Sequence, residues 1–146
     1  MTSPQPRLLI FIVAYFAETT IKKVVSRIPV ILAQTYDVEI LIIDDSSTDD
    51  TFAESISAGN HAEIPFKVTV LHNPANQGYG GNQKIGYQYA IEHGHDLVAL
   101  LHGDGQYAPE VLGALAEPVR AGEADAVFGS RMLIPGAALK GEEEAP

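Results

Sequence analysis

Residues 39–51 read EILIIDDSSTDDT, an apolar run that ends abruptly in two adjacent acids and continues into serine, threonine and aspartate. Consecutive apolar side chains are typical of a strand that is buried on both faces of a sheet. The polar residues that follow are typical of a turn or a helix start, and Thr48 or Asp49 is the expected N-cap. The stretch therefore predicts a buried parallel strand whose carboxyl end carries Asp44 and Asp45.

The same alternation of strand and helix extends along the chain in both directions. Further strands are expected at residues 8–14, 66–71, 97–101 and 124–130. Helices are expected around residues 21–28, from 49 to 58, from about 80 to 92, and from 109 to 119. This order predicts an α/β fold with a parallel-core sheet and helices on both faces, in which ligands bind beyond the carboxyl ends of the strands.

Composition limits the classes of function. The chain has 146 residues, of which 46% are hydrophobic, which is enough for a packed core and excludes a disordered chain. Nine basic residues stand against 19 acidic ones, and the net charge of −10 argues against a nucleic-acid partner. There is no cysteine, so disulfides, thiolate zinc sites and thiol nucleophiles are excluded.

No targeting or membrane segment is expected. No apolar run approaches the roughly 20 residues that a membrane-spanning helix needs. The apolar run at residues 8–14 lacks a small-x-small cleavage site, so a strand explains it better than a signal peptide. We therefore expect an unprocessed, cytoplasmic chain with one domain at residues 1–134. Residues 135–146, which include three consecutive acids, are expected to form a flexible acidic tail.

Two residues after the strand at 97–101 are suited to bind a cation. Asp104 lies in a Gly-Asp-Gly turn, from which its carboxylate can reach Mg²⁺ or Mn²⁺. The same triplet is good turn chemistry, so a purely structural role is the alternative. His102 precedes Asp104 by two residues and points to the same side if the segment is extended. It is either a second metal ligand or a hydrogen-bonding neighbour.

Other strand ends carry groups suited to a nucleotide. Asp44 and Asp45 could accept hydrogen bonds from a nucleobase and a ribose, or form an Asx-turn and a helix cap. Glycines at positions 78, 80 and 81 would let the backbone approach a ligand, although Gln83 breaks a dinucleotide fingerprint. Arg131 could pair with a phosphate, or alternatively with Asp125. The remaining histidines, at positions 61, 72, 93 and 95, are expected to be solvated.

The ordered set resembles the inverting glycosyltransferases of family 2, which have the GT-A fold, and in particular the polyprenyl-phosphate sugar synthases. Residues 44–51 are similar to the family's DDGSTDGT, and residues 76–80 match its Asn-x-Gly-x-Gly segment. Residues 103–110 resemble its metal loop and the Pro-Glu helix start that follows, and residues 129–131 match its Gly-Ser-Arg strand end. The resemblance covers residues 8–131, and its motifs occur in the family's order.

The resemblance implies a Rossmann-like half that binds a nucleotide-diphosphate sugar. The acceptor would be a polyprenyl phosphate or a saccharide, with peripheral association at the inner face of the membrane. Asp104 and His102 would hold Mg²⁺ or Mn²⁺ against the diphosphate, and Arg131 would neutralise diphosphate charge. The donor site implied in this way comprises Tyr15, Asp44, Asp45, Gly78, Gly80, Lys84, Gly103 and Arg131.

The sequence departs from the family pattern at the first and fourth strands. His102 stands where the first acid of the family's Asp-x-Asp is usual. Val13, Phe16 and Ala17 replace the Pro, Asn and Glu of its Pro-x-Tyr-Asn-Glu. The acceptor half, with any general base, would lie beyond Pro146, so these residues alone are expected to bind donor with little or no transfer.

Two other classes of parallel α/β protein fit less well. A phospho-receiver-like signalling module needs acids after the first strand and a lysine after the fifth, but residues 14–16 are Ala-Tyr-Phe and residue 131 is arginine. A nucleotidyltransferase usually carries a glycine-rich basic loop after the first strand, and this chain has none there. Both classes are disfavoured.

Overall fold

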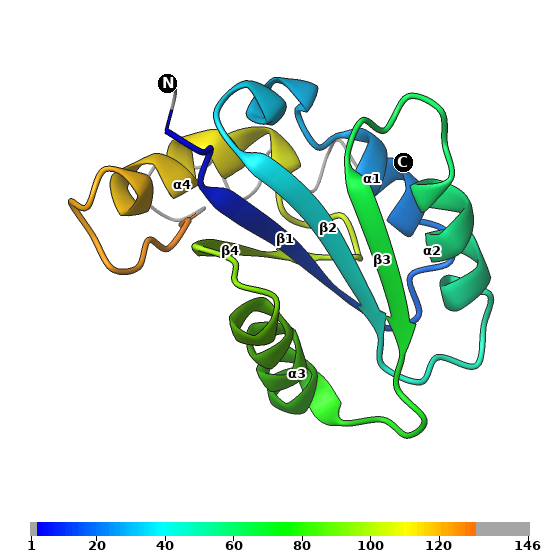
Figure 1. Cartoon of the computed structure of the whole chain (residues 1–146). Coiled ribbons are helices and arrows are strands. Elements are labelled where there is room, and N and C mark those ends of the chain that lie inside the picture. Colours follow the sequence, from blue (N-terminus) through cyan, green and yellow to red (C-terminus); the bar gives the residue numbers. More distant parts are fainter. Residues whose placement is uncertain (1–2, 131–146) are drawn as a thin grey trace.

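The computed structural model describes residues 3–130, whose core is a four-stranded parallel sheet (Figure 1). The strands lie side by side in the order β3-β2-β1-β4, and all three pairings are parallel. The registers bring the carboxyl ends of the strands to one edge of the sheet. The strands are β1 (Arg7–Ala14), β2 (Asp37–Asp44), β3 (Lys67–His72) and β4 (Leu97–His102).

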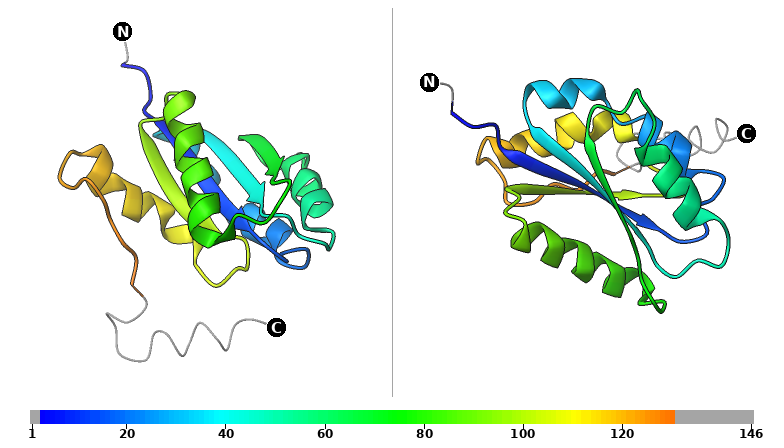
Figure 2. Two further views of the ribbon diagram at one scale, coloured as in Figure 1. Left: turned by 90° about the horizontal axis from the view of Figure 1, so that it is seen from below. Right: turned by 45° about the vertical axis from the view of Figure 1, so that its right-hand side comes forward.

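Helices cover both faces of the sheet, which confirms the predicted α/β class. In Figure 1 and the right-hand view of Figure 2, α3 covers one face, and the other three helices lie on the opposite face. The helices are α1 (Ile21–Ser26), α2 (Thr51–Gly59), α3 (Gly78–Glu92) and α4 (Leu112–Arg120), with short 3₁₀ turns η1 (Val30–Gln34) and η2 (Pro109–Val111). As expected, α1 ends before Pro29 and Pro109 begins a helical segment.

The side chains of β1 show why its sequence is apolar at nearly every position. Alternate residues point to opposite faces of a sheet, and here both faces are covered by helices. Leu8, Ile10 and Ile12 belong to the cluster that includes α1 and α4. Phe11 belongs to the cluster on the α3 side, and a Cβ on Gly86 would lie 2.1 Å from its Cε1. Glycine at position 86 therefore lets α3 pack closely on the sheet.

The prediction of a fifth strand at residues 124–130 is wrong. These residues form no strand, and the Phe128 side chain is 89% exposed. A groove of about 520 Å³ is lined by residues of β4, by residues of α4 and by residues 125–129. The segment therefore lacks the backbone partner that a strand requires, and β4 pairs only with β1 among the described residues.

The N-cap position of α2 lies one residue after the predicted Asp49, although the Asp49 side chain makes the capping hydrogen bonds. The helix begins at Thr51 with Asp50 as N-cap, and the Asp50 side chain makes no capping hydrogen bond. Instead, Oδ1 of Asp49 accepts hydrogen bonds from the main-chain N of Thr51 at 3.0 Å and from its hydroxyl at 2.6 Å. The boundary at residue 134 and the tail at 135–146 lie outside the described residues. Within residues 3–130, no helix is long and apolar enough to span a bilayer.

Candidate functional site

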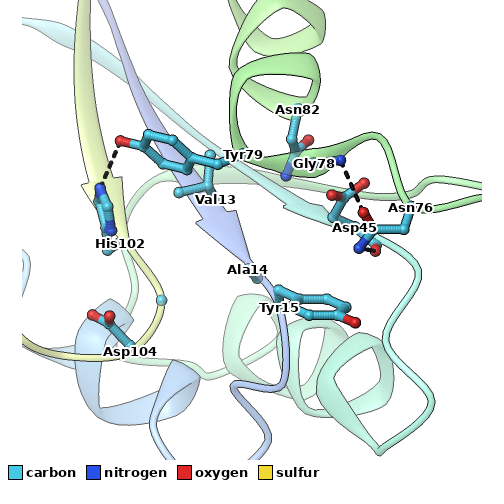
Figure 3. A pocket seen from close by; sticks show the side chains of 11 residues that line it. Val13, Ala14, Tyr15, Asp45, Asn76, Gly78, Tyr79, Asn82, His102 and Asp104 are labelled. Carbon is cyan, nitrogen blue, oxygen red and sulfur yellow. Dashed lines mark hydrogen bonds between the residues drawn. The ribbon is translucent and has the colours of Figure 1, made fainter.

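A cavity of about 350 Å³ opens at the carboxyl edge of the sheet (Figure 3). Its wall is built from the ends of β1 and β4, the residue that follows β2, and the first turn of α3. It therefore lies where ligands bind in parallel α/β sheets. Six of the sequence-predicted site residues line it: Tyr15, Asp45, Gly78, His102, Gly103 and Asp104.

The carboxylate of Asp45 is held by groups from the following strand and helix. Its Oδ1 accepts hydrogen bonds from Nδ2 of Asn73 and from the main-chain N of Gln77, both at 2.8 Å. Its main-chain carbonyl accepts one from Nδ2 of Asn76 at 3.1 Å. Both hydrogen bonds that the described residues donate to this carboxylate reach Oδ1.

Asp44 has a different environment from its neighbour. Its side chain is fully buried and does not line the cavity. Its Oδ1 accepts hydrogen bonds from the main-chain N and the hydroxyl of Ser47, and its Oδ2 lies 2.8 Å from Nδ1 of His72. These contacts fix the turn after β2, so the structure brings only one of the two adjacent acids to the cavity.

The turn after β2 also holds the loop after β1. The hydroxyl oxygens of Ser47 and Thr51 accept hydrogen bonds from the main-chain N atoms of Phe16 and Ala17, at 3.0 and 2.8 Å. Phe16 has a φ of 49°, in the left-handed region that a bulky side chain rarely adopts. The tied loop directs the half-exposed Tyr15 ring to the cavity (Figure 3).

His102 is surrounded by aromatic rings at the end of β4. The hydroxyl of Tyr79, in the first turn of α3, lies 2.9 Å from Nε2 of His102 (Figure 3). The ring centroids of Tyr79 and Tyr107 lie 5.2 and 4.8 Å from that of His102. The predicted extended segment after His102 is wrong, because the chain turns there and Gly105 has a φ of 79°.

Asp104 nevertheless lines the same cavity as His102 and Asp45. Its side chain is exposed, and its Oδ1 accepts a hydrogen bond from the main-chain N of Gln106 at 3.0 Å. Gly103 allows the β4 loop to approach β1, because a Cβ there would lie 3.2 Å from the carbonyl oxygen of Val13. Asp45 and Asp104 thus reach one cavity from different strands, as the sequence analysis required.

The side chains of Asp104 and His102 suit a divalent cation that takes its remaining ligands from water or from a bound molecule. No group of three or more His, Cys, Asp or Glu residues is placed to hold a metal within residues 3–130. Asp104 and His102 offer one carboxylate and one imidazole beside open space. Mg²⁺ and Mn²⁺ sites commonly combine one or two protein ligands with water and phosphate oxygens. The residues present therefore suit a cation shared with a phosphorylated ligand.

Other predicted residues lie outside the cavity wall. Gly80 and Lys84 are on α3 and do not line it. Arg131 lies outside the described residues. The prediction that His95 is solvated is wrong: its side chain is fully buried, and its Nε2 lies 3.2 Å from Oε2 of Glu39.

Three residues of the site were missed in the sequence. Asn73 follows β3 as Asp45 follows β2, and this position after a strand was the signal available. Asn82 is buried, lines the cavity and donates to the carbonyl of Ile43 at 3.1 Å. Tyr79 lies within the matched glycine segment, at a position that the motif leaves open.

The fold and cavity define a GT-A type α/β protein, and comparison with known proteins identifies the family. The sequence profile described as Glycosyl transferase family 2 matches residues 9–142, and the chain belongs to that family. Its predicted GT-A fold is confirmed by a solved structure, glucosyl-3-phosphoglycerate synthase from Mycobacterium tuberculosis in complex with Mn²⁺, UDP-glucose and phosphoglyceric acid. The TM-score is 0.60 at 20% identity, over 81% of this chain and 40% of that one.

Two sequence relatives carry names that specify a reaction. The chain is 30% identical to polyprenol monophosphomannose synthase of Mycolicibacterium smegmatis, over 94% of this chain and 49% of the relative. It is 38% identical to undecaprenyl-phosphate mannosyltransferase of Micrococcus luteus, over 67% of this chain and 38% of the relative. The chain thus spans half or less of the length of these relatives.

Proposed function

We propose that the cavity binds a nucleotide-diphosphate sugar and that the protein transfers the sugar with inversion. One observation carries this proposal: Asp45, after β2, and Asp104, after β4, line the same cavity at the carboxyl edge of the sheet. When the sugar is transferred, the nucleoside diphosphate departs as a polyanionic leaving group. The negative charge that develops on it must be stabilised. The two acids would serve different ends of the donor, one the nucleoside and the other the cation on the diphosphate.

The nucleoside end would bind beside β1 and β2. The Oδ2 atom of Asp45 can accept a hydrogen bond from a base N–H or a ribose hydroxyl, since ionised carboxylates only accept. The ring of Tyr15 lines the same cavity and would offer a face for stacking (Figure 3). Roles for Asp44, Gly80, Lys84 and Arg131 in the donor site stay predictions.

The diphosphate end would lie between the first turn of α3 and the β4 loop. Gly78 begins α3 and lines the cavity, so the positive end of this helix faces it. Asp104 and His102 would hold Mg²⁺ or Mn²⁺, and the Mn²⁺ named for the M. tuberculosis structure supports the presence of a divalent cation. A bound divalent cation would neutralise charge that develops on the departing diphosphate.

The names of the sequence relatives support an acceptor of the polyprenyl-phosphate class. A phosphate oxygen is already ionised and needs no base, whereas a saccharide hydroxyl needs one. The location that goes with a lipid-linked acceptor is the cytoplasmic face of the membrane. In the domain assignment that we propose, residues 1–134 form the donor-binding domain, with the tail at 135–146 outside it.

Titration calorimetry tests the donor site directly. UDP-, GDP- and dTDP-linked sugars are titrated into the chain with and without Mn²⁺. We expect one nucleotide to bind in a Mn²⁺-dependent manner and Asp104→Asn to abolish that dependence. Asp37→Asn is the matched control, because Asp37 is an exposed aspartate at the opposite edge of the sheet. If Asp104→Asn binds with the same Mn²⁺ dependence as the wild type, Asp104 does not belong to the site. If none of the three donors binds, the proposal is refuted.

A further inference from the structure

We propose that Tyr79 is a positioning residue for the cation site: its hydroxyl holds Nε2 of His102, so that Nδ1 of the same ring faces the cation bound by Asp104. The proposal rests on the proposed function and deepens it, because it specifies the chemistry of the site. The pair Tyr79–His102 would take the place of the first acid of the family's Asp-x-Asp.

The geometry around His102 carries this proposal. Tyr79 projects from α3 across the cavity, and its hydroxyl is 2.9 Å from Nε2 of His102. Tyr79 and Asp104 lie on opposite sides of the imidazole (Figure 3). Because Nε2 is hydrogen-bonded to Tyr79, the other ring nitrogen, Nδ1, is the one that can face Asp104. The ring of Tyr107, 4.8 Å away between centroids, further limits rotation of the imidazole.

The hydrogen bond also selects the form of the ring that can bind a metal. A histidine that ligates a metal usually donates its other N–H to a neighbouring acceptor, which fixes the tautomer. The hydroxyl oxygen of Tyr79 can accept that hydrogen bond from Nε2. Nδ1 then carries no proton, and its lone pair is free to coordinate.

An imidazole ligand changes which cation the site prefers. Mg²⁺ strongly prefers oxygen ligands, whereas Mn²⁺ also takes imidazole nitrogen. A site made of His102, Asp104 and diphosphate oxygens would therefore favour Mn²⁺ over Mg²⁺. Replacing His102 by aspartate would restore two carboxylates and raise the affinity for Mg²⁺.

Pulsed electron paramagnetic resonance of bound Mn²⁺ tests the proposal without an activity assay. The probes are Mn²⁺ with UDP, GDP or dTDP, added to the chain. We expect the spectrum of the ternary complex to show coupling to a directly bound imidazole nitrogen, and His102→Asp to abolish it. Tyr79→Phe should weaken Mn²⁺ binding to the nucleotide complex about 10-fold, the effect of losing an outer-shell partner. Tyr87→Phe, on the same helix but outside the cavity, should match the wild type.

A double variant separates positioning from a general effect on folding. In the His102→Asp background, Tyr79→Phe should leave Mn²⁺ affinity unchanged, because the imidazole that it positions is gone. If Mn²⁺ and a nucleotide bind without nitrogen coupling, or if Tyr79→Phe binds Mn²⁺ like the wild type, the role of Tyr79 is refuted and the donor site stands. If none of the three nucleotides binds with Mn²⁺, the proposed function fails as well.

Discussion

Asp45 and Asn73 are joined by a buried side-chain hydrogen bond, with Oδ1 of Asp45 2.8 Å from Nδ2 of Asn73. The same Oδ1 accepts a hydrogen bond from the main-chain N of Gln77, just before α3. One carboxylate thus connects the end of β2 to the residue after β3 and to the start of α3. The residue that we assign to the nucleoside is also part of the framework.

Asp45→Ala should therefore destabilise the fold as well as abolish nucleotide binding. The substitution removes the acceptor of the Gln77 N–H and leaves the Asn73 amide only the longer contact with Oδ1 of Asn82 at 3.4 Å. Loss of the partner of a buried donor costs about 1–3 kcal/mol. We expect the free energy of unfolding, measured by urea titration, to fall by that amount. Glu63→Ala, at an exposed position in the loop before β3, should change it by less than about 0.5 kcal/mol. Wild-type stability of Asp45→Ala would show that these hydrogen bonds do not support the fold.

The buried carboxylate of Glu39 makes part of the stability dependent on pH. Burial raises its pKa, but hydrogen bonds from Tyr89, Thr69 and Lys67 outweigh burial and keep the pKa below the ordinary value of 4.5. Because folding lowers the pKa of Glu39, its ionised carboxylate stabilises the fold above pH 4.5. That stabilisation is lost as the pH falls through the pKa of the folded state. Glu39→Gln should be less stable than the wild type at pH 7, with a difference that shrinks on acidification.

The pH profile of the urea midpoint between pH 3 and 7 checks this prediction. Glu63→Gln serves as control, because Glu63 is exposed in the loop before β3, and its profile should run parallel to that of the wild type. A constant difference between Glu39→Gln and the wild type over the whole range would contradict the proposed linkage.

Two glycines of the same helix should respond in opposite ways to alanine. A Cβ on Gly86 would overlap the ring of Phe11, which is fully buried, so Gly86→Ala must displace α3 or the ring. Overpacking of this kind costs about 1–3 kcal/mol. A Cβ on Gly80 meets nothing within 4 Å, so Gly80→Ala should raise stability by about 0.5–1 kcal/mol through helix propensity. Thermal unfolding of both variants measures the contrast. A loss of stability in Gly80→Ala as well as in Gly86→Ala would contradict the open space around position 80.

The loop that carries Asp104 is followed by an ion pair between Arg27, the C-cap residue of α1, and Glu110 in η2. Nε and Nη2 of Arg27 lie 2.7 and 2.9 Å from the two carboxylate oxygens of Glu110, and hydrogen bonding to Arg27 lowers the pKa of Glu110. Arg27→Lys cannot form both bonds. Because the pair is partly exposed, the expected loss of stability is at most about 1 kcal/mol, and it should shrink in 1 M salt. Urea titrations at two salt concentrations test this, and an equal loss at both would rule out an electrostatic origin.

The strands of the core could be predicted because their apolar runs are nearly unbroken. Leu8 to Ala14 is buried on both faces, and a short apolar run with β-branched residues favours such a strand over a buried helix. Residues 124–130 contain a similar but shorter apolar run. Whether such a run forms a strand depends on a neighbouring strand with which it can pair, and local sequence does not specify that partner. Periodicity therefore predicted the four paired strands and failed at the edge of the sheet.

The site was predictable chiefly in its strand-end residues. Asp45 follows β2, His102 ends β4 and Asp104 lies just beyond it, so topology alone places them at one edge. The choice of Asp45 over Asp44 depends on the turn that Ser47 stabilises, and the role of Tyr79 depends on the path of α3 across the cavity. Both are tertiary relationships, which a single sequence does not reveal.

The shared use of Asp45 by scaffold and ligand limits how this region can change by mutation. A variant that altered base preference through position 45 would also remove the nearer acceptor of the Asn73 amide and the acceptor of the Gln77 N–H. Replacements that compensate for the lost hydrogen bonds would have to be in place before position 45 could change. Selection for a new donor is therefore expected to act more readily at Tyr15, whose ring is half exposed and whose replacement leaves the inter-strand connection intact.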